Sequence, residues 1–223
     1  MKLHADLSQR AIVESENIDW VASPLTGVWR RMLERDGEEV ARATSIVRYD
    51  ANSAFDAHEH GGGEEFMVLA GVFTDEHGDY PAGSYVRNPV GSAHTPSSAA
   101  GCDILVKLRQ MDPADQDYVR VDTTDPAAAW EPSGLDGLDR LTLHEFDGVK
   151  TYLARFQPGC VAAEHDHPGG EEVFVLEGTL QDEDGTYPEG TWLRLPAGSR
   201  HHPRSDAGCL LYVKIGHLPV AEP

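Results

Sequence analysis

The sequence predicts an all-β protein built from two tandem copies of one domain. The segment from His58 to Leu108 aligns without a gap with the segment from His165 to Ile215, and more than half of the aligned positions are identical. A long repeat kept in register is typical of a duplicated domain. We therefore expect two domains, over residues 19–123 and 124–223, after an N-terminal extension over residues 1–18.

The predicted strands are short apolar runs that occupy matching places in the two copies. They are rich in β-branched and aromatic residues and end at glycine or proline, which is the pattern of a sandwich or barrel. The clearest runs are 66–69, 84–87 and 104–108 in the first copy, and 173–176, 191–195 and 210–215 in the second. No long amphipathic helix pattern accompanies them.

Two features beside these runs also repeat. An acidic, glycine-containing turn over 75–81 corresponds to 182–188 and predicts a hairpin in each copy. His77 lies in the first turn only, and we interpret it as a solvated turn residue. Arg87 and Arg194 match in register, and we expect exposed strand arginines rather than residues that face the interior.

Length and charge bound the classes of partner. The 223 residues suffice for two domains of about 100 residues each. The net charge of −20, from 38 acidic and 18 basic residues, argues against nucleic acids and anionic membrane surfaces as partners. No apolar run is long enough to span a membrane, and the polar start does not resemble a signal peptide.

The cysteines indicate the compartment. Three are present, Cys102, Cys160 and Cys209, and the first and last match in register. A sparse, odd number argues against a disulfide framework and for a reducing cytoplasm. We expect small buried residues at strand starts, while redox sensitivity of these thiols stays an open alternative.

Each copy carries a histidine cluster with the chemistry of a metal site. Residues i and i+2 of a strand share a face, so each His-x-His pair projects together. A glycine-rich turn then leads to a glutamate, and a later histidine follows a Pro-x-Gly turn. Three neutral imidazoles and one carboxylate suit zinc, iron, manganese, nickel or cobalt. The predicted ligands are His58, His60, Glu64 and His94 in the first copy, and His165, His167, Glu171 and His201 in the second.

These motifs resemble the signature of the cupin family. The pattern G-x5-H-x-H-x3-E-x6-G fits the second copy from Gly159 to Gly178, and the first copy fits with Asn52 in place of the leading glycine. The later pattern G-x5-P-x-G-x2-H-x3-N fits both copies, except that Ser98 and Ser205 replace its final asparagine. The resemblance implies two tandem cupin domains, jelly-roll-like barrels known as double-stranded β-helices, with the metal inside. It assigns the ligand roles to the eight residues named above.

Within that family the chain is similar to the ChrR-type cupins, named for a domain of a zinc-containing bacterial anti-sigma factor. The GGEE motif, the Tyr-Pro-x-Gly turn and the late Gly-Cys pair carry this likeness, and acetylacetone-cleaving dioxygenases are similar in the same core. The sigma-binding helical domain of those factors holds zinc through H-x3-C-x2-C. This sequence has no C-x2-C, so we do not expect sigma inhibition by that mechanism.

Three functions follow from the resemblance. The first is a zinc-containing regulatory or sensing protein of the stress response, with a sigma factor or a small molecule as partner. The second is a metal-dependent dioxygenase acting on a small dicarbonyl, and the third is a binding cupin without turnover. The glutamate retained in both ligand sets favours the regulatory function, because a fuller protein shell leaves less room for substrate and oxygen. No side chain is assigned a catalytic role, no further cofactor is expected, and a homodimer is an alternative to a monomer.

Overall fold

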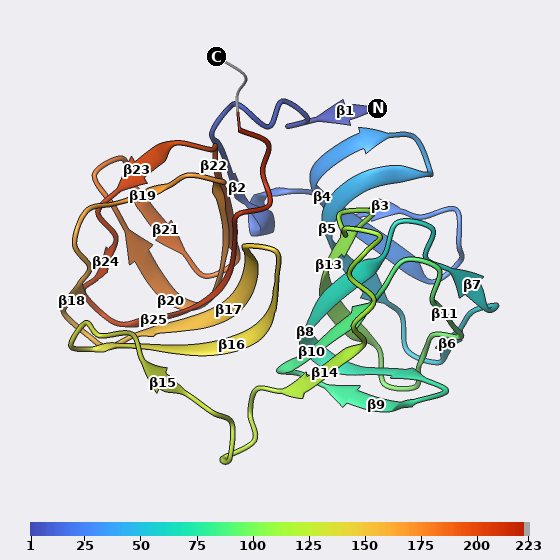
Figure 1. Cartoon of the computed structure of the whole chain (residues 1–223). Coiled ribbons are helices and arrows are strands. Elements are labelled where there is room, and N and C mark those ends of the chain that lie inside the picture. The colour runs from blue at the N-terminus through green and yellow to red at the C-terminus, as the bar shows by residue number, and fades with distance from the viewer. Residues whose placement is uncertain (221–223) are drawn as a thin grey trace. The chain divides into compact units, whose positions relative to one another are not determined.

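The computed structural model describes residues 1–220, and their fold is all-β, as predicted (Figure 1). The chain divides into two compact units, one of residues 1–5 and 18–126, the other of residues 6–17 and the chain from 127 on. The predicted extension, 1–18, is thus shared out between the units. The sheets are jelly-roll-like but do not close into the expected barrels. Among residues 1–220, no helix is long and apolar enough to cross a membrane.

The first unit contains thirteen strands. They are β1 (Lys2–Leu3), β3 (Val21–Ala22), β4 (Val28–Gly37), β5 (Ala41–Tyr49), β6 (Ser53–Ala54), β7 (His58–Glu59), β8 (Glu64–Asp75), β9 (Gly78–Pro81), β10 (Ser84–Asn88), β11 (Ala93–His94), β12 (Ser97–Ser98), β13 (Cys102–Leu108) and β14 (Val119–Asp122). The main sheet runs β1-β4-β5-β13-β8-β10-β14, and β7 pairs separately with β11.

The second unit repeats this plan. Its elements are β2 (Ala11–Glu14), the 3₁₀ turn η1 (Ser15–Asn17), β15 (Glu131–Pro132), β16 (Leu138–Phe146), β17 (Val149–Phe156), β18 (Cys160–Val161), β19 (His165–His167), β20 (Glu171–Gln181), β21 (Thr186–Pro188), β22 (Thr191–Leu195), β23 (Ser199–His201), β24 (Arg204–Ser205) and β25 (Cys209–Ile215). Its main sheet runs β15-β16-β17-β25-β20-β22-β2, and β19 pairs with β23.

Each unit has its own apolar core between its sheets. In the first unit, Phe66, Val68 and Ile104 are each about 1% exposed. In the second, Val175 is fully buried and Leu193 is 1% exposed. Burial of such side chains stabilises each unit without help from a disulfide.

At one end of each main sheet is a strand that lies outside the repeated segments of the sequence. In the second unit, β2 pairs with β22 and sets Ala11 opposite Arg194. In the first unit, β14 pairs with β10 and sets Val119 opposite Arg87. These two strands therefore occupy equivalent positions in their sheets. They differ in chain order, because β2 comes before all other strands of the second unit and β14 comes after all other strands of the first.

This pairing explains why the expectation of exposed arginines at Arg87 and Arg194 is wrong. Arg87 is 3% exposed and forms a buried ion pair with Asp115, with Nη2 and Oδ2 at 2.5 Å, while its Nη1 donates to the Asp117 carbonyl at 2.8 Å. Arg194 is 1% exposed, and its Nη2 donates to the Asp6 carbonyl at 2.8 Å. The segments leading into β14 and β2 cover these guanidinium groups.

Candidate metal centres

The four predicted ligands of the first copy converge in the first unit. One nitrogen or oxygen from each of His58, His60, Glu64 and His94 lies within 4.8 Å of the others. Glu64 Oε2 is 3.6 Å from Nε2 of both His60 and His94. These distances suit atoms that face a common point, which is the arrangement of a mononuclear metal site.

Strand pairing brings these side chains together. Pairing of β7 with β11 sets His58 opposite His94, while Glu64 is the first residue of β8. Upstream, Asn52 has a φ of +62°, and Gly159 has a φ of +79° at the matching place of the second unit. Asparagine adopts this left-handed conformation more readily than most residues, which explains how it replaces the signature glycine.

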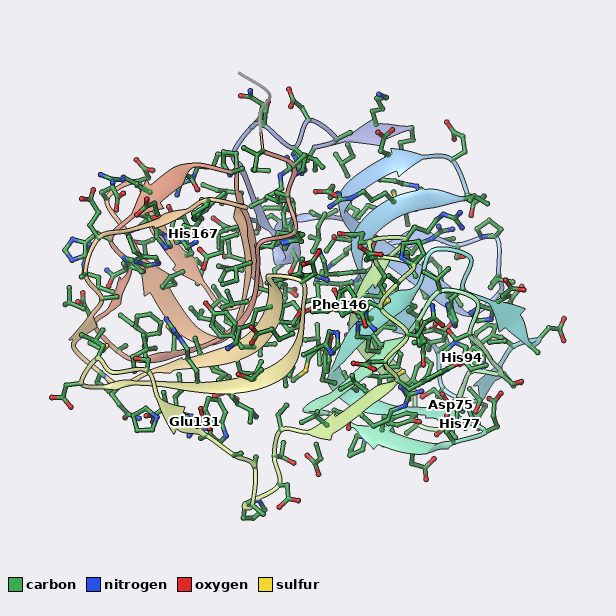
Figure 2. The ribbon with its side chains drawn as sticks, viewed as in Figure 1. Asp75, His77, His94, Glu131, Phe146 and His167 are labelled. Carbon is green, nitrogen blue, oxygen red and sulfur yellow. The ribbon has the colours of Figure 1, made fainter. Side chains whose placement is uncertain are left out.

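The second unit gathers its predicted ligands in the same way. Pairing of β19 with β23 sets His165 opposite His201. One ring nitrogen from each of His165, His167 and His201 lies within 4.8 Å of the others. Glu171 Oε2 is 3.4 Å from Nε2 of His167 and of His201, so the glutamate contacts two of the three histidines without joining the tightest group. Figure 2 places His167 within this unit.

Several of these atoms are buried without a hydrogen bond. Within residues 1–220, Nε2 of His60, of His167 and of His201 makes none, and neither does Glu171 Oε2. Buried polar atoms are normally satisfied, so an unsatisfied group indicates a missing ion or water. Because the unsatisfied atoms are the predicted ligand atoms and face one another, the residues fit a divalent cation.

The electrostatics agree with that fit. Burial lowers the pKa of His60, and burial with the neighbouring histidines lowers the pKa of His167 to about 3. These imidazoles are therefore neutral at pH 7, which is the form that binds metals. Burial also raises the pKa of Glu171 to about 7. A cation at this place would return that carboxyl group to its ionised form.

Each centre has an outer carboxylate that the sequence analysis did not single out. In the first unit, Asp75 Oδ2 lies 3.4 Å from Nδ1 of His94, and the three labels Asp75, His77 and His94 cluster in Figure 2. Asp75 also accepts hydrogen bonds from the backbone N–H of His77 and from the hydroxyl of Tyr80. Burial opposes ionisation, yet the hydrogen bonds with His94, His77 and Tyr80 hold the pKa of Asp75 below its ordinary value. His77 itself is exposed, as expected for a turn residue.

The second unit has the same arrangement around Asp182. Its Oδ2 lies 3.9 Å from Nδ1 of His201, and its Oδ1 accepts a hydrogen bond from the Tyr187 hydroxyl at 2.6 Å. Arg10, which lies just before β2, reaches Asp182 at 2.9 Å and the Tyr187 hydroxyl at 2.7 Å. The sequence does contain a sign of this role, because Asp75 and Asp182 occupy matching positions in the two copies. From the sequence alone, both are interpreted only as residues of acidic turns.

Asp75→Asn should weaken metal binding at the first centre by about 10- to 100-fold, the usual effect of losing a carboxylate behind a ligand histidine. The amide keeps the size of the side chain but removes the negative charge that orients His94. Competition with a fluorescent chelator measures the affinity. Asp79→Asn is the matched control, because Asp79 is exposed and its carboxylate accepts a hydrogen bond from Thr74. Equal affinities in the two variants would contradict the role given to Asp75.

The two centres differ in what surrounds them. In the first unit, the Phe73 ring lies 5.7 Å from the His94 ring and 4.6 Å from the Phe66 ring, measured between centroids. At the matching positions the second unit has the smaller Leu180 and Val173. There a cavity of about 320 Å³ extends along the inside of the sheets and reaches His165, Glu171 and His201.

The three cysteines are free, buried thiols. Cys102 and Cys209 begin β13 and β25, as expected for buried residues at strand starts. Burial raises the pKa of each of these two to about 11, and it raises the pKa of Cys160 as well.

Thiols of this kind should react slowly in the folded protein, because the thiolate is the reactive form. We expect the reaction with Ellman's reagent at pH 8 to be at least about 100-fold slower in native protein than in guanidinium chloride. The time course at 412 nm measures both rates. Rapid labelling of any cysteine in the native state would restore redox sensing as an alternative.

Comparisons with known proteins agree with this geometry. The model of the ChrR cupin-like domain matches the chain twice, over residues 8–112 and 117–219. No curated protein matches the chain. A presumed dioxygenase from Nostoc punctiforme is 15% identical with a TM-score of 0.78, over 97% of this chain and 88% of that one.

Two further solved structures have the same fold at low identity. Protein YlbA from E. coli is 16% identical with a TM-score of 0.72, over 98% and 95% of the two chains. Oxalate decarboxylase from Bacillus subtilis is 13% identical with a TM-score of 0.61, over 95% of this chain and 78% of that one. The chain therefore belongs to the ChrR cupin-like family, as a tandem of two cupin domains.

Proposed function

We propose that the chain is a regulatory metalloprotein that holds one divalent cation in each unit and senses a small molecule at the second. Zinc is the first choice of metal, because three imidazoles and a carboxylate suit it, with iron, manganese and nickel as alternatives. The observation that carries this proposal is the set of buried, unsatisfied ring nitrogens at His60, His167 and His201. Burying several ring nitrogens without a hydrogen-bond partner would destabilise the fold unless a cation bound them.

The surroundings of the centres support a division of roles. The aromatic side chains Phe66 and Phe73 pack beside His94, so a cation in the first unit would mainly stabilise the fold. The cavity of the second unit instead gives a small molecule access to His165 and His201. A cation held there would act as a Lewis acid toward an oxygen of that molecule.

Elemental analysis of protein purified without chelator or added metal tests the proposal. We expect two metal equivalents per chain, with zinc predominant, and we expect the metal to stay bound during gel filtration. A chain that contains no stoichiometric metal, and binds none when zinc is added, would overturn it. A sigma factor is the protein partner to test first, by co-purification with the zinc-loaded chain.

A metal-dependent dioxygenase acting on a small dicarbonyl is the second candidate function. It is favoured by the tight three-histidine group of the second unit, which leaves more positions open than a shell completed by Glu171. The test is oxygen uptake after loading with ferrous iron under argon and adding acetylacetone and air. Uptake well above that of His94→Ala and His201→Ala would establish turnover, and no uptake by an iron-loaded chain would reject it.

A further inference from the structure

The cavity of the second unit has a charged group at its edge. Arg140 of β16 lines the cavity together with apolar side chains that include Val173, Leu180 and Leu211. The guanidinium carbon lies 5.3 Å from the centroid of the Tyr152 ring, and the residue is exposed to solvent. The positive charge of Arg140 favours ionisation of Glu171 and opposes protonation of His165. Arg140 is thus part of the same pocket as the candidate ligands.

The matching arginine of the first unit is neutralised, whereas Arg140 is not. Arg30 pairs with Val47 as Arg140 pairs with Ala154, so the two arginines hold equivalent positions. Arg30 Nη2 donates to Glu39 Oε2 at 3.3 Å and to Ser23 Oγ at 3.0 Å. Across residues 1–220, the guanidinium of Arg140 has no carboxylate within 4.0 Å and makes no hydrogen bond. It does make a cation–π contact with the Tyr152 ring.

Arg140 thus carries a positive charge beside the cavity in a chain that has 38 acidic residues and 18 basic ones. A cation placed beside an apolar cavity and left without an anion is suited to pair with the anion of a ligand. If a divalent cation is bound as proposed above, the pocket would contain the positive charges of that cation and of Arg140 and the single negative charge of Glu171. Its net charge would then be positive within a strongly acidic protein.

We infer that the second unit binds a small organic acid, with its carboxylate on Arg140 and its apolar body against Val173, Leu180 and Leu211. The cavity of about 320 Å³ lies at the small end of the range for ligand pockets, which limits the ligand to a compact molecule. This inference names the class of the sensed molecule and in that respect rests on the proposed function. The Arg140 contact itself does not require the metal.

The experiment uses butanoate, hexanoate and benzoate as probes, with hexan-1-ol as the neutral control, in calorimetric titrations of the full chain. We expect at least one acid to bind and hexan-1-ol to bind more weakly than hexanoate. Arg140→Met should raise the Kd of that acid at least about tenfold, since a hydrogen bond to a charged group contributes about 1.5–3 kcal/mol. Binding of hexan-1-ol should not change in this variant.

Two further variants make the result specific. Arg30→Met removes the equivalent charge in the first unit and should leave acid binding unchanged. Leu180→Phe introduces the phenylalanine that the first unit has at the equivalent position, Phe73. The larger side chain should fill the cavity and reduce binding of the acid. Melting curves and metal content confirm that each variant is folded and loaded as the parent.

Titrations of zinc-loaded and chelator-treated protein separate this inference from the proposed function. Zinc retention with acid binding that is absent, or equal in Arg140→Met, would overturn the inference and leave the metal proposal standing. Acid binding that depends on Arg140 in a chain that retains no metal would overturn the metal proposal and support the inference.

Discussion

His201→Ala should reduce the metal content of the chain from two equivalents to one. His201 supplies an unsatisfied, buried ring nitrogen at the second centre, and its removal leaves His165, His167 and Glu171 to hold the cation. The affinity of this centre should fall by more than about 100-fold, since even the loss of an outer partner costs about 10- to 100-fold. Elemental analysis after gel filtration measures the stoichiometry, and chelator competition measures the affinity.

The neighbouring histidine offers a matched control. His202 is exposed, its backbone N–H donates to Glu183 Oε2 at 2.9 Å, and it does not belong to the group formed by His165, His167 and His201. His202→Ala should therefore keep both metal equivalents. Retention of two equivalents by His201→Ala, or loss of one by His202→Ala, would show that the ligand set is wrong.

Arg87→Met should lower the free energy of unfolding of the first unit by about 3–5 kcal/mol, the usual cost of breaking a buried ion pair from one side. The side chains of Arg87 and Asp115 are only 4% and 5% exposed. The variant keeps the apolar stem of residue 87 but removes the positive charge that compensates the burial of Asp115. It also removes the hydrogen bond to the Asp117 carbonyl, which anchors the segment before β14.

Guanidinium chloride unfolding of metal-free protein measures this effect, so that any bound metal does not contribute. Lys2→Met is the control, because Lys2 and Asp36 form an exposed ion pair within the first unit that is worth less than about 1 kcal/mol. A loss in Arg87→Met no larger than that of the control would mean that the buried pair does not hold the outermost strand.

Much of the candidate site could be predicted because it depends on local spacing. His165 and His167 are two residues apart on one strand, so their side chains share a face wherever that strand lies. The later histidine could be added because the duplication keeps it in register. Glu64 and Glu171 could be chosen over the adjacent Glu65 and Glu172, which repeat as well, because they match the glutamate of the cupin signature. The same register separated His201 from the adjacent His202.

The outer residues could not be predicted in the same way. Asp75 and Asp182 lie in acidic turns, and several nearby residues have the same charge, so only the folded hairpin selects the one that faces a histidine. Arg87 and Arg194 were expected to be exposed because nothing in β10 or β22 shows that the segments leading into β14 and β2 cover them. Those segments lie outside the repeated stretch of the sequence.

By itself the sequence determined the all-β class and the duplication, and it predicted the eight candidate ligands. It could do so because strand periodicity and a repeated register are properties of neighbouring residues. Only the tertiary structure decided which strand completes each sheet, which carboxylates face the histidines and that a cavity lies beside Arg140. Those features depend on contacts between residues far apart in the chain, where the size of one side chain, such as Leu180 or Phe73, sets the space left beside another.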